Sequence, residues 1–504
     1  MKTVSVSITR SHGFFRKLMV RAAKRSALAL KSFAGWLTAY PTTDAKCKIF
    51  EGGKPPAGGS PDMALAGNLS TLAAQGRHVE RGTCMGRAVA EAWKADLVGS
   101  GIAVSPKSGD KTLDALLTVP WKLFCECACV DGMPLWEWQA MMIGSLPPAG
   151  AGLSRFVLIP ERIAQGLIPL ALLPLEIEWL SEEAVASVPA DHKFVRGIEL
   201  DKFGRPQFYH LRNPETLDIT SGERVPAAQI VHIFEKRRAQ QSHGEPVLAP
   251  AIERIMQGDR LPRIELDAAV NSSAPSVAIK TQRALDIGDD DEDPTTDIPP
   301  GAVVRLLPGE DIATVPNSRP SQLIEPFISA MRGDVAAATR VNRQVLDRDY
   351  QRSTFMNSRM SNQDTDRLQA SIKSAANRML AGRIYEAAFP WLMMAIGRPM
   401  PADPRKLAQM MRYAVRPDAR PYVDPVKDVA SAVNAIAQNL STYHIECAAR
   451  GKDFDEIIAE RKLENDALQA AGLPVPTVIK PSTQPQQKKA DGEEIEDEEA
   501  AANA

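Results

Sequence analysis

The sequence is short of cysteine, of long apolar runs and of net charge. Six cysteines in 504 residues do not make a disulfide framework, which suits a reducing cytoplasm. The longest apolar region, residues 167–175, is cut by Pro169 and Pro174, and is much shorter than the roughly 18 residues that a membrane helix needs. Lysine and arginine number 60 against 62 aspartates and glutamates, so no global basic field attracts nucleic acid. We expect no membrane association, and any contact with DNA must be local.

Common catalytic motifs are also missing. The sequence has no Gly-x-x-x-x-Gly-Lys-Ser/Thr phosphate loop, no Gly-x-Ser-x-Gly elbow and no His-Glu-x-x-His helix, which disfavours the common ATPases, hydrolases and metalloproteases. The seven histidines are scattered singly, as is typical of structural residues rather than of bases or ligands. We predict no catalytic residue, no cofactor and no enzymatic activity.

Cys125, Cys127 and Cys129 form a cluster that could suggest a metal site. A structural zinc site needs a second pair of cysteines or histidines at a suitable spacing, and no histidine lies near this run. Unpaired cysteine is a common small core residue. We therefore favour core thiols and predict no metal site.

The two ends of the chain differ in charge from its body. The basic residues of the first 31 positions, where no acid occurs, include Arg10, Arg16, Lys17, Arg21, Lys24, Arg25 and Lys31. A Gly/Pro-rich break follows at 51–60. Residues 475–504 turn to Pro, Gln, Lys and then Glu, a composition that buries too little apolar surface to fold alone. The chain is otherwise long enough for two or more structural modules.

Periodicity and turn signals predict helices mixed with strands, an α+β class. Residues 63–97 and 246–274 have helical patterns, and Val98–Val104 is a turn into a strand. A hairpin is predicted for 197–211 and a further strand for 230–234.

Two long helices are predicted in the second half of the chain. The first carries an apolar stripe that recurs every three or four residues, at Leu323, Phe327, Met331, Val335, Ala338, Val341 and Val345. The second starts near Asn362 and runs until Pro390 stops it. Later capping signals are Asp424-Pro425, Asp453 and Gly472.

Two charged groups stand out between these elements. Arg332, Arg340 and Arg343 fall on one face of the first helix, away from its apolar stripe, and Arg348 and Arg352 follow in a polar segment. The acidic run consists of Asp289, Asp290, Asp291, Glu292 and Asp293. That run lacks the alternating ligands, central glycine and distal glutamate of an EF-hand, so we favour a solvated loop over a calcium site.

Six phrases, in sequence order, resemble the lambda-like family of tailed-bacteriophage portal proteins. They are Arg87 to Ala103, the hairpin Gly197 to Tyr209, Val225 to Phe234, Gly244 to Pro250, Asp349 to Arg359, and Arg420 to Lys427 with Gly451-Lys-Asp beyond. The resemblance spans roughly residues 65–474. The segment 147–166 departs from it, since it is rich in proline and glycine where the family pattern has a strand.

The resemblance implies a portal fold, with an α/β wing, a helical stem, a small clip and a helical crown around a central channel. Applied to this sequence, it predicts the following parts: a basic N-terminal arm and linker at 1–60, the wing at 61–245, stem helices at 246–276 and 319–346, the clip at 277–318, a channel loop at 347–357, a long wing helix and wing–crown connection at 358–423, the crown at 424–474 and a disordered acidic tail at 475–504.

The resemblance also implies a function. Such a protein forms a homo-oligomeric ring, usually of twelve subunits, at one capsid vertex, through which double-stranded DNA is packaged and ejected without sequence specificity. Its implied partners are the large terminase subunit, the head–tail completion protein and the major capsid and scaffold proteins. It is expected in the virion, and in the host cytoplasm during assembly.

Sliding DNA requires few contacts, directed at phosphates rather than at bases. Our hypothesis is that Arg332, Arg340, Arg343, Arg348 and Arg352 face the channel; salt bridges between subunits are the alternative. The acidic run at 289–293 is expected to face clip partners. Two other functions stay open: a DNA-processing enzyme or motor subunit, and a helical adaptor that forms no ring.

Overall fold

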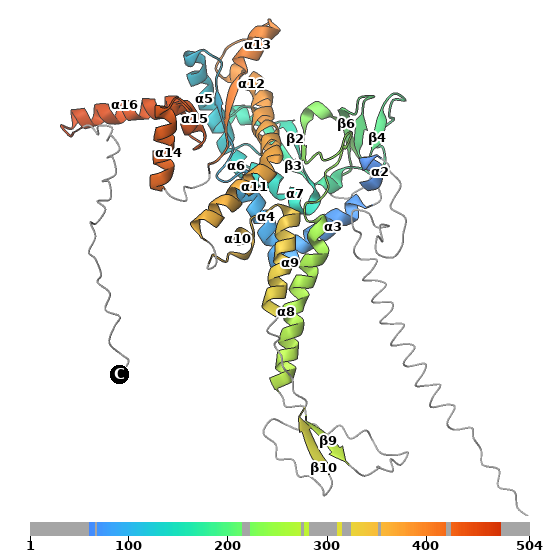
Figure 1. Cartoon of the computed structure of the whole chain (residues 1–504). Coiled ribbons are helices and arrows are strands. Elements are labelled where there is room, and N and C mark those ends of the chain that lie inside the picture. Colours follow the sequence, from blue (N-terminus) through green and yellow to red (C-terminus); the bar gives the residue numbers. More distant parts are fainter. Residues whose placement is uncertain are drawn as a thin grey trace, which may run out of the picture. The chain divides into compact units, whose positions relative to one another are not determined.

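A computed structural model describes residues 60–65, 68–213, 222–273, 277–281, 310–314, 324–350, 354–419 and 425–474. The chain divides into two compact units, Met1–Arg420 and Pro421–Ala504. The first contains helices and four antiparallel sheets, and the second contains helices, so the predicted α+β class is confirmed (Figure 1). The predicted N-terminal arm, most of the predicted clip and the C-terminal tail lie outside the described residues.

The first helical region agrees with its prediction. It contains α2 (Pro61–Leu65), α3 (Leu69–Gly82) and α4 (Cys84–Leu97). Thr83 separates the last two helices, because its extended backbone ends α3 while its hydroxyl accepts a hydrogen bond from the Gly86 amide and caps α4. The predicted turn follows, and β1 (Ala103–Pro106) pairs with β11 (Tyr413–Arg416).

Three further helices and a three-stranded sheet follow. The helices are α5 (Lys111–Glu126), α6 (Leu135–Gly144) and α7 (Leu146–Ala149), and the strands, in the order β3-β2-β8, are β3 (Leu170–Leu175), β2 (Ala151–Leu158) and β8 (Ile230–Phe234). β8 confirms a predicted strand. β2 lies in the segment whose prolines and glycines obscured it. It starts directly after Gly150, whose left-handed φ of 83° turns the chain out of α7.

A four-stranded meander contains the predicted hairpin. Its strands are β4 (Lys193–Val195), β5 (Ile198–Leu200), β6 (Pro206–Leu211) and β7 (Glu223–Pro226). Asp201 builds the hairpin turn, since its carboxylate accepts hydrogen bonds from the amides of Phe203 and Arg205. Short 3₁₀ turns, η2 (Pro160–Gln165), η3 (Ile177–Trp179), η4 (Ala227–Gln229) and η5 (Ala249–Ala251), connect the elements.

Glu199 is a charged residue buried inside this meander. Its carboxylate lies 2.9 Å from the Arg224 guanidinium, 2.5 Å from His192 Nδ1 and 3.2 Å from His210 Nε2. Burial alone would raise its pKa, but these donors outweigh that effect and lower the pKa to about 2. Glu199 is therefore ionised in the folded protein and ties β5, β6, β7 and the preceding loop together.

Two helices and a strand pair follow. α8 (Ile252–Ser273) packs beside α9 (Ile324–Thr339), and β9 (Val277–Thr281) pairs with β10 (Glu310–Thr314) between them in sequence (Figure 1). The apolar stripe predicted one helix as far as Val345, which is wrong. The chain leaves α9 at Arg340, whose φ is +57°, and a separate helix α10 (Arg343–Asp347) begins after the Asn342 cap.

The last helices of the first unit also differ from their predicted bounds. α11 (Phe355–Ala376) begins before Asn362, since Thr354 caps it, and it passes through a π-helical segment at Asn377–Gly382 into α12 (Arg383–Ala395). Pro390 lies inside α12 and does not end it. A proline removes one helical hydrogen bond, whereas this helix buries Tyr385, Phe389 and Leu392. α13 (Pro404–Met410) follows.

The main core of the first unit is built around aromatic side chains. Its largest fully buried side chains are Trp93, Trp138, Tyr385, Phe124 and Phe389. The Trp121 ring meets Tyr385 edge-on at 5.1 Å between centroids, and its indole donates a hydrogen bond to the Val104 carbonyl. Trp121 of α5 thereby joins α12 to β1.

The capping signals predict the boundaries of the second unit in part. The helices of this unit are α14 (Pro425–Ala437), α15 (Tyr443–Ala448) and α16 (Phe454–Ala470). α16 lies between Asp453 and Gly472, but the stretch predicted as one helix up to Gly451 contains two, α14 and α15, and Asp424 lies outside the described residues. Asp453 caps α16 through the Asp455 amide, and Gly472 ends it with a φ of 70°. Within the described part of the chain, no helix is long and apolar enough to cross a bilayer.

Gly76 of α3 lies against α7, and a Cβ at this position would stand 2.0 Å from the Pro148 carbonyl oxygen. We predict that Gly76→Ala lowers the free energy of unfolding of the first unit by about 3 kcal/mol, because backbone must move. Gly82→Ala is the matched control: a Cβ there meets nothing within 4 Å, and alanine should stabilise the helix by about 0.5 kcal/mol. Urea unfolding of both variants measures the difference; equal effects contradict the close packing.

The Glu199 cluster predicts a pH-dependent stability. Since the folded pKa of Glu199 lies below its ordinary value of 4.5, its contribution is complete above that value and is lost as the pH falls toward 2. Glu199→Gln should cost about 3 kcal/mol at pH 7, and this difference from wild type should shrink between pH 5 and pH 3. Glu182→Gln, at an exposed partner of Arg196, should cost well under 1 kcal/mol. If the difference in unfolding free energy between Glu199→Gln and wild type, measured in urea, does not change with pH, Glu199 is not ionised in the folded protein.

Candidate functional site

The candidate site is the connection from α9 through α10 to α11, where the predicted channel arginines lie. The chain makes two left-handed turns here, at Arg340 and at Arg348, on either side of α10. Non-glycine residues adopt such φ values at a cost of roughly 1 kcal/mol or more, so side-chain contacts must hold the backbone. The site is therefore built from the partners of its arginines.

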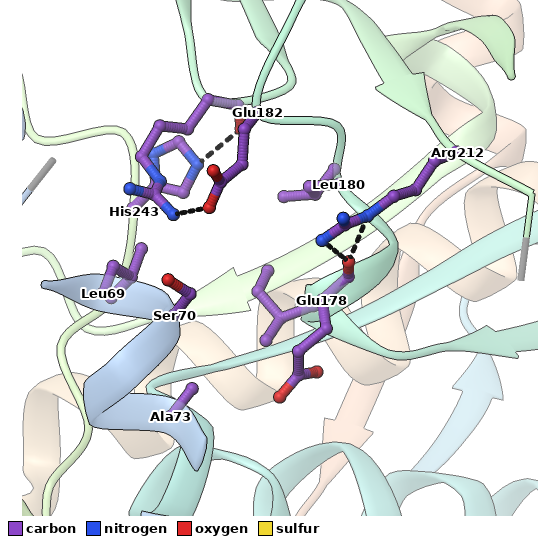
Figure 2. A pocket seen from close by; sticks show the side chains of 10 residues that line it. Leu69, Ser70, Ala73, Glu178, Leu180, Glu182, Arg212 and His243 are labelled. Carbon is purple, nitrogen blue, oxygen red and sulfur yellow. Dashed lines mark hydrogen bonds and ion pairs between the residues drawn. The ribbon is translucent and has the colours of Figure 1, made fainter. Parts of the chain in front are cut away.

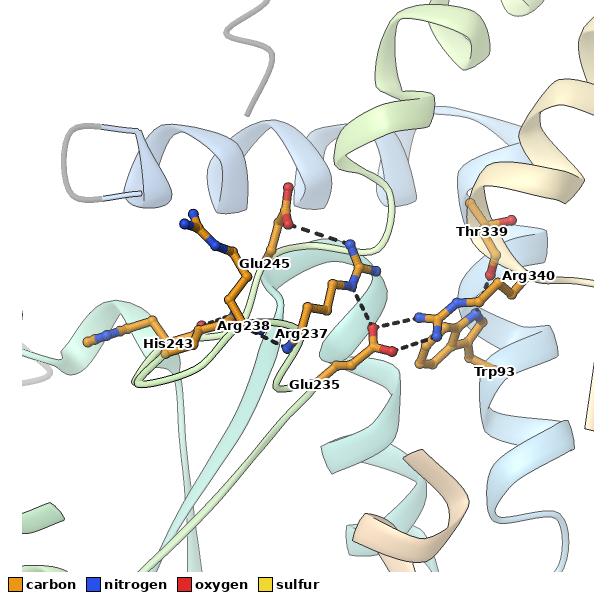
Figure 3. A network of polar contacts seen from close by, with 9 residues as sticks. Trp93, Glu235, Arg237, Arg238, His243, Glu245, Thr339 and Arg340 are labelled. Carbon is orange, nitrogen blue, oxygen red and sulfur yellow. Dashed lines mark hydrogen bonds and ion pairs between the residues drawn. The ribbon is translucent and has the colours of Figure 1, made fainter. Parts of the chain in front are cut away.

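Arg340 is fixed by a network on three other elements. Its guanidinium makes two hydrogen bonds, of 2.6 and 2.7 Å, to the Glu235 carboxylate after β8. Figure 3 shows this pair beside Trp93 of α4, whose ring centroid lies 5.2 Å from the guanidinium. The Trp93 indole donates to the Thr339 carbonyl at 3.0 Å, and the buried Gln369 amide donates to the Arg340 carbonyl.

Glu235 stays ionised in this network. Burial alone would raise its pKa, but the hydrogen bonds and charge of Arg340, with a smaller part from Arg237, hold it below its usual value. Arg237 lies between Glu235 and Glu245, at 2.9 and 3.5 Å (Figure 3). The guanidinium of Arg340 is thus turned inward, and its side chain is only 17% exposed. The helical phase that predicted an exposed Arg340 is wrong, because the helix ends one residue earlier.

Arg332 and Arg343 share one carboxylate. Asp347 accepts from Arg343 Nε at 3.3 Å, and its other oxygen lies 3.6 Å from Arg332 Nε. Arg343 also donates to the Ser329 hydroxyl, which fastens α10 to α9. The Asp347 side chain is 10% exposed, whereas those of Arg332 and Arg343 are 44% and 49% exposed. Both cations therefore remain accessible, with a carboxylate behind them.

Of the remaining predicted residues, Arg348 lies in the described part of the chain, and the others do not. Arg348 is exposed and, of the described interactions, takes part in no hydrogen bond or ion pair. Arg352 lies outside the described residues. So do Asp289, Asp290, Asp291, Glu292 and Asp293, and the partner-facing role of that run stays a prediction.

Sequence reasoning missed both acidic partners of the arginines. Glu235 lies 105 positions from Arg340, and no local pattern joins them. Asp347 stands four residues after Arg343, a spacing that favours an ion pair on a helix and could have indicated it. Arg332, Arg340 and Arg343 each have an acidic partner within the chain, and the alternative of salt bridges between subunits stays a prediction.

A small pocket lies between α3 and the meander, and its charged side chains are already engaged in contacts within the chain. It is lined by Leu69, Ser70, Ala73, Ile177, Glu178, Leu180, Glu182, Arg196, Arg212 and His243. Its cations are engaged, since Arg196 pairs with Glu182. Arg212 donates to the Glu178 carbonyl, as Figure 2 shows. The His243 imidazole contacts the Arg196 carbonyl at 3.0 Å. These contacts stabilise the meander.

The cysteine run is part of the core region. Cys129 is buried, and burial raises the pKa of the Cys125 and Cys129 thiols to about 12, so both are protonated. Among the residues that the structure describes, no group of three or more His, Cys, Asp or Glu side chains could hold a metal ion.

A comparison with known protein families shows the family to which the chain belongs. Residues 51–372 match the model of the family described as phage portal protein, lambda family. The chain therefore belongs to the lambda family of phage portal proteins.

Two curated relatives carry the same description. The chain is 26% identical over 304 residues to the portal protein of Escherichia phage N15, and 26% identical over 282 residues to portal protein B of Escherichia phage lambda. These matches cover 54% and 49% of this chain, and 57% and 52% of the relatives. The chain thus spans little more than half the length of the curated relatives it matches.

Solved structures of low identity are also similar. The neck of an empty GTA particle, computed with C6 symmetry, contains a chain of 15% identity and TM-score 0.45, with 85% of this chain and 98% of that chain covered. The neck of a native GTA particle, computed with C12 symmetry, gives 16% identity and TM-score 0.44, with coverage of 85% and 98%.

The network around Arg340 predicts a graded response to substitution. Arg340→Met keeps an apolar stem over Trp93 but removes the charge, and should lower the free energy of unfolding by about 2 kcal/mol, because Glu235 loses its bidentate partner in a half-buried place. Arg237→Met removes the more exposed partner of the same carboxylate and should cost under 1 kcal/mol. Thermal unfolding of both variants compares them. Equal losses of unfolding free energy in the two variants would show that the bidentate geometry adds no extra stability.

Proposed function

We propose that the chain forms a homo-oligomeric ring at one vertex of a phage capsid, and that double-stranded DNA passes through this ring during packaging and ejection. Membership of the portal family supports the proposal. The proposed role is structural rather than enzymatic, and the ring is expected in the virion.

The exposure of apolar side chains in the second unit supports assembly into an oligomer. Within the described residues 425–474, no apolar side chain is buried. Val426 is 77% exposed and Leu440 is 82% exposed, and residues 429–440, most of them in α14, carry no charge. Helices of this length are marginally stable alone and need an apolar partner surface. Packing of neighbouring copies in a closed ring supplies such a surface.

The α8–α9 pair has a comparable surface. Ile264, Leu266 and Val270 of α8 and Phe327 of α9 are each about half exposed or more. Within the described residues, about half or more of each of these side chains is left uncovered. A ring of parallel α8–α9 pairs would bury them between copies, and in the proposed division of the chain α8 and α9 are the stem helices.

DNA passage is supported by the charge of the α9–α10 connection. Arg332, Arg343 and Arg348 are exposed in an otherwise near-neutral chain. Contacts with phosphates through such cations are independent of sequence and exchange readily, as sliding requires. The large terminase subunit, the head–tail completion protein and the capsid and scaffold proteins are the proposed partners.

The mass of the purified protein tests the ring. A closed assembly should appear in light scattering as a high multiple of 54.8 kDa, about 660 kDa for twelve copies. We predict that Val433→Glu in α14 prevents this assembly while leaving the unfolding of the first unit unchanged. Phe203→Glu, an exposed residue at the tip of the β5–β6 hairpin, should assemble as wild type does. A full-sized ring of Val433→Glu would contradict burial of α14 between copies.

A further inference from the structure

The Arg332–Asp347–Arg343 cluster is built with its carboxylate inside and its cations outside. The two guanidiniums approach opposite oxygens of Asp347, at 3.6 and 3.3 Å. The acid comes from the last residue of α10, and the bases come from α9 and from the first residue of α10. A molecule that approaches this face meets the half-exposed arginines before it meets the aspartate.

This arrangement lowers the charge of the surface without covering it. The cluster carries two positive charges and one negative charge, so Asp347 cancels half of its positive field. The Glu235 carboxylate also has two arginine partners, but its bidentate partner Arg340 is only 17% exposed and Arg237 is 38% exposed. By contrast, Arg332 and Arg343 are 44% and 49% exposed. Both arginines at Asp347 therefore stay accessible and are still paired.

We propose that Asp347 is a positioning and charge-masking residue for DNA passage. Its carboxylate holds Arg332 and Arg343 at the surface and weakens their electrostatic attraction to DNA phosphates. This inference rests on the proposed function, since it needs DNA beside the α9–α10 connection. The arginines of this connection then form a graded set, with Arg340 withdrawn, Arg332 and Arg343 masked, and Arg348 exposed without a partner among the described residues.

The physical reason is the requirement that DNA slides. Each phosphate neutralised by a fixed cation releases counterions and adds to the binding free energy. A ring repeats every cation in each copy, so two unmasked arginines per subunit would surround the duplex with attachment points. One carboxylate per copy weakens the binding of DNA phosphates, while the arginines still keep the duplex in the middle of the channel.

The test compares binding of a linear duplex to assembled rings over a range of salt. Asp347→Asn should bind the duplex more tightly at low salt, and the slope of log K against log salt should steepen by about 0.9 for each added phosphate contact. Glu91→Gln is the matched control. Glu91 also lies between two bases, Arg87 at 3.5 Å and Lys94 at 3.0 Å, but on α4, so the change in charge is identical and the affinity should stay as in wild type.

Two further measurements separate masking from other effects. The double variant Asp347→Asn with Arg332→Gln has the net charge of wild type and should return toward the wild-type slope. A covalently closed circular duplex, which cannot enter a closed ring by an end, should show no gain with Asp347→Asn. Light scattering and thermal unfolding of each variant confirm that rings of folded protein are compared.

The outcomes are distinct. A gain confined to Asp347→Asn and to linear DNA supports the masking role. An unchanged slope in Asp347→Asn rings that bind DNA as wild type does overturns masking and leaves the proposed function intact. Equal gains in Asp347→Asn and Glu91→Gln, or equal gains with circular DNA, overturn it as a bulk charge effect. Wild-type protein that forms no ring overturns the proposed function, and the masking role with it.

Discussion

The junction at the end of α9 is the interaction on which the described arrangement of the first unit depends. Arg340 adopts a left-handed backbone there, and its guanidinium is held by Glu235 and Trp93 while its carbonyl is held by Gln369. Four elements that are distant in sequence, α4, β8, α9 and α11, meet at this residue. The direction in which the chain leaves α9, and hence the position of α10 with its exposed arginines, follows from these contacts.

Much of the fold could be predicted from local patterns, because local physics decides those elements. The β5–β6 hairpin follows from its turn chemistry, α16 begins at its Asp453 cap, and β8 consists of branched and aromatic apolar residues around His232. The misplaced boundaries have different causes. The start near Asn362 was wrong because an earlier local cap, Thr354, begins α11, and the stripe toward Val345 hid the Asn342 cap that begins α10. At Pro390 the buried residues of α12 outweigh the local stop signal.

The candidate site was predicted only in part. The helical phase predicted Arg332 and Arg343 on one exposed face of a single helix; both are accessible and share Asp347, but Arg343 lies on the separate helix α10. The phase failed for Arg340, because an ion pair across 105 positions cannot be found from spacing. Which of these cations is withdrawn and which is accessible depends on long-range pairing, and so does the electrostatic surface that the proposed function uses.

The π-helical segment at Asn377–Gly382 has a consequence for how this protein can change in evolution. One additional residue in a helical turn rotates everything after it by about 100°. Here the turn sets the azimuth at which α12 presents Tyr385 and Phe389 to the core, and it brings Gly382 beneath the Tyr413 hydroxyl, where a Cβ would stand 2.3 Å away. Deletion of a single residue from this turn would re-phase the whole of α12. Length variation among relatives should therefore accumulate in the loops and spare this helix, although nothing in its composition distinguishes it.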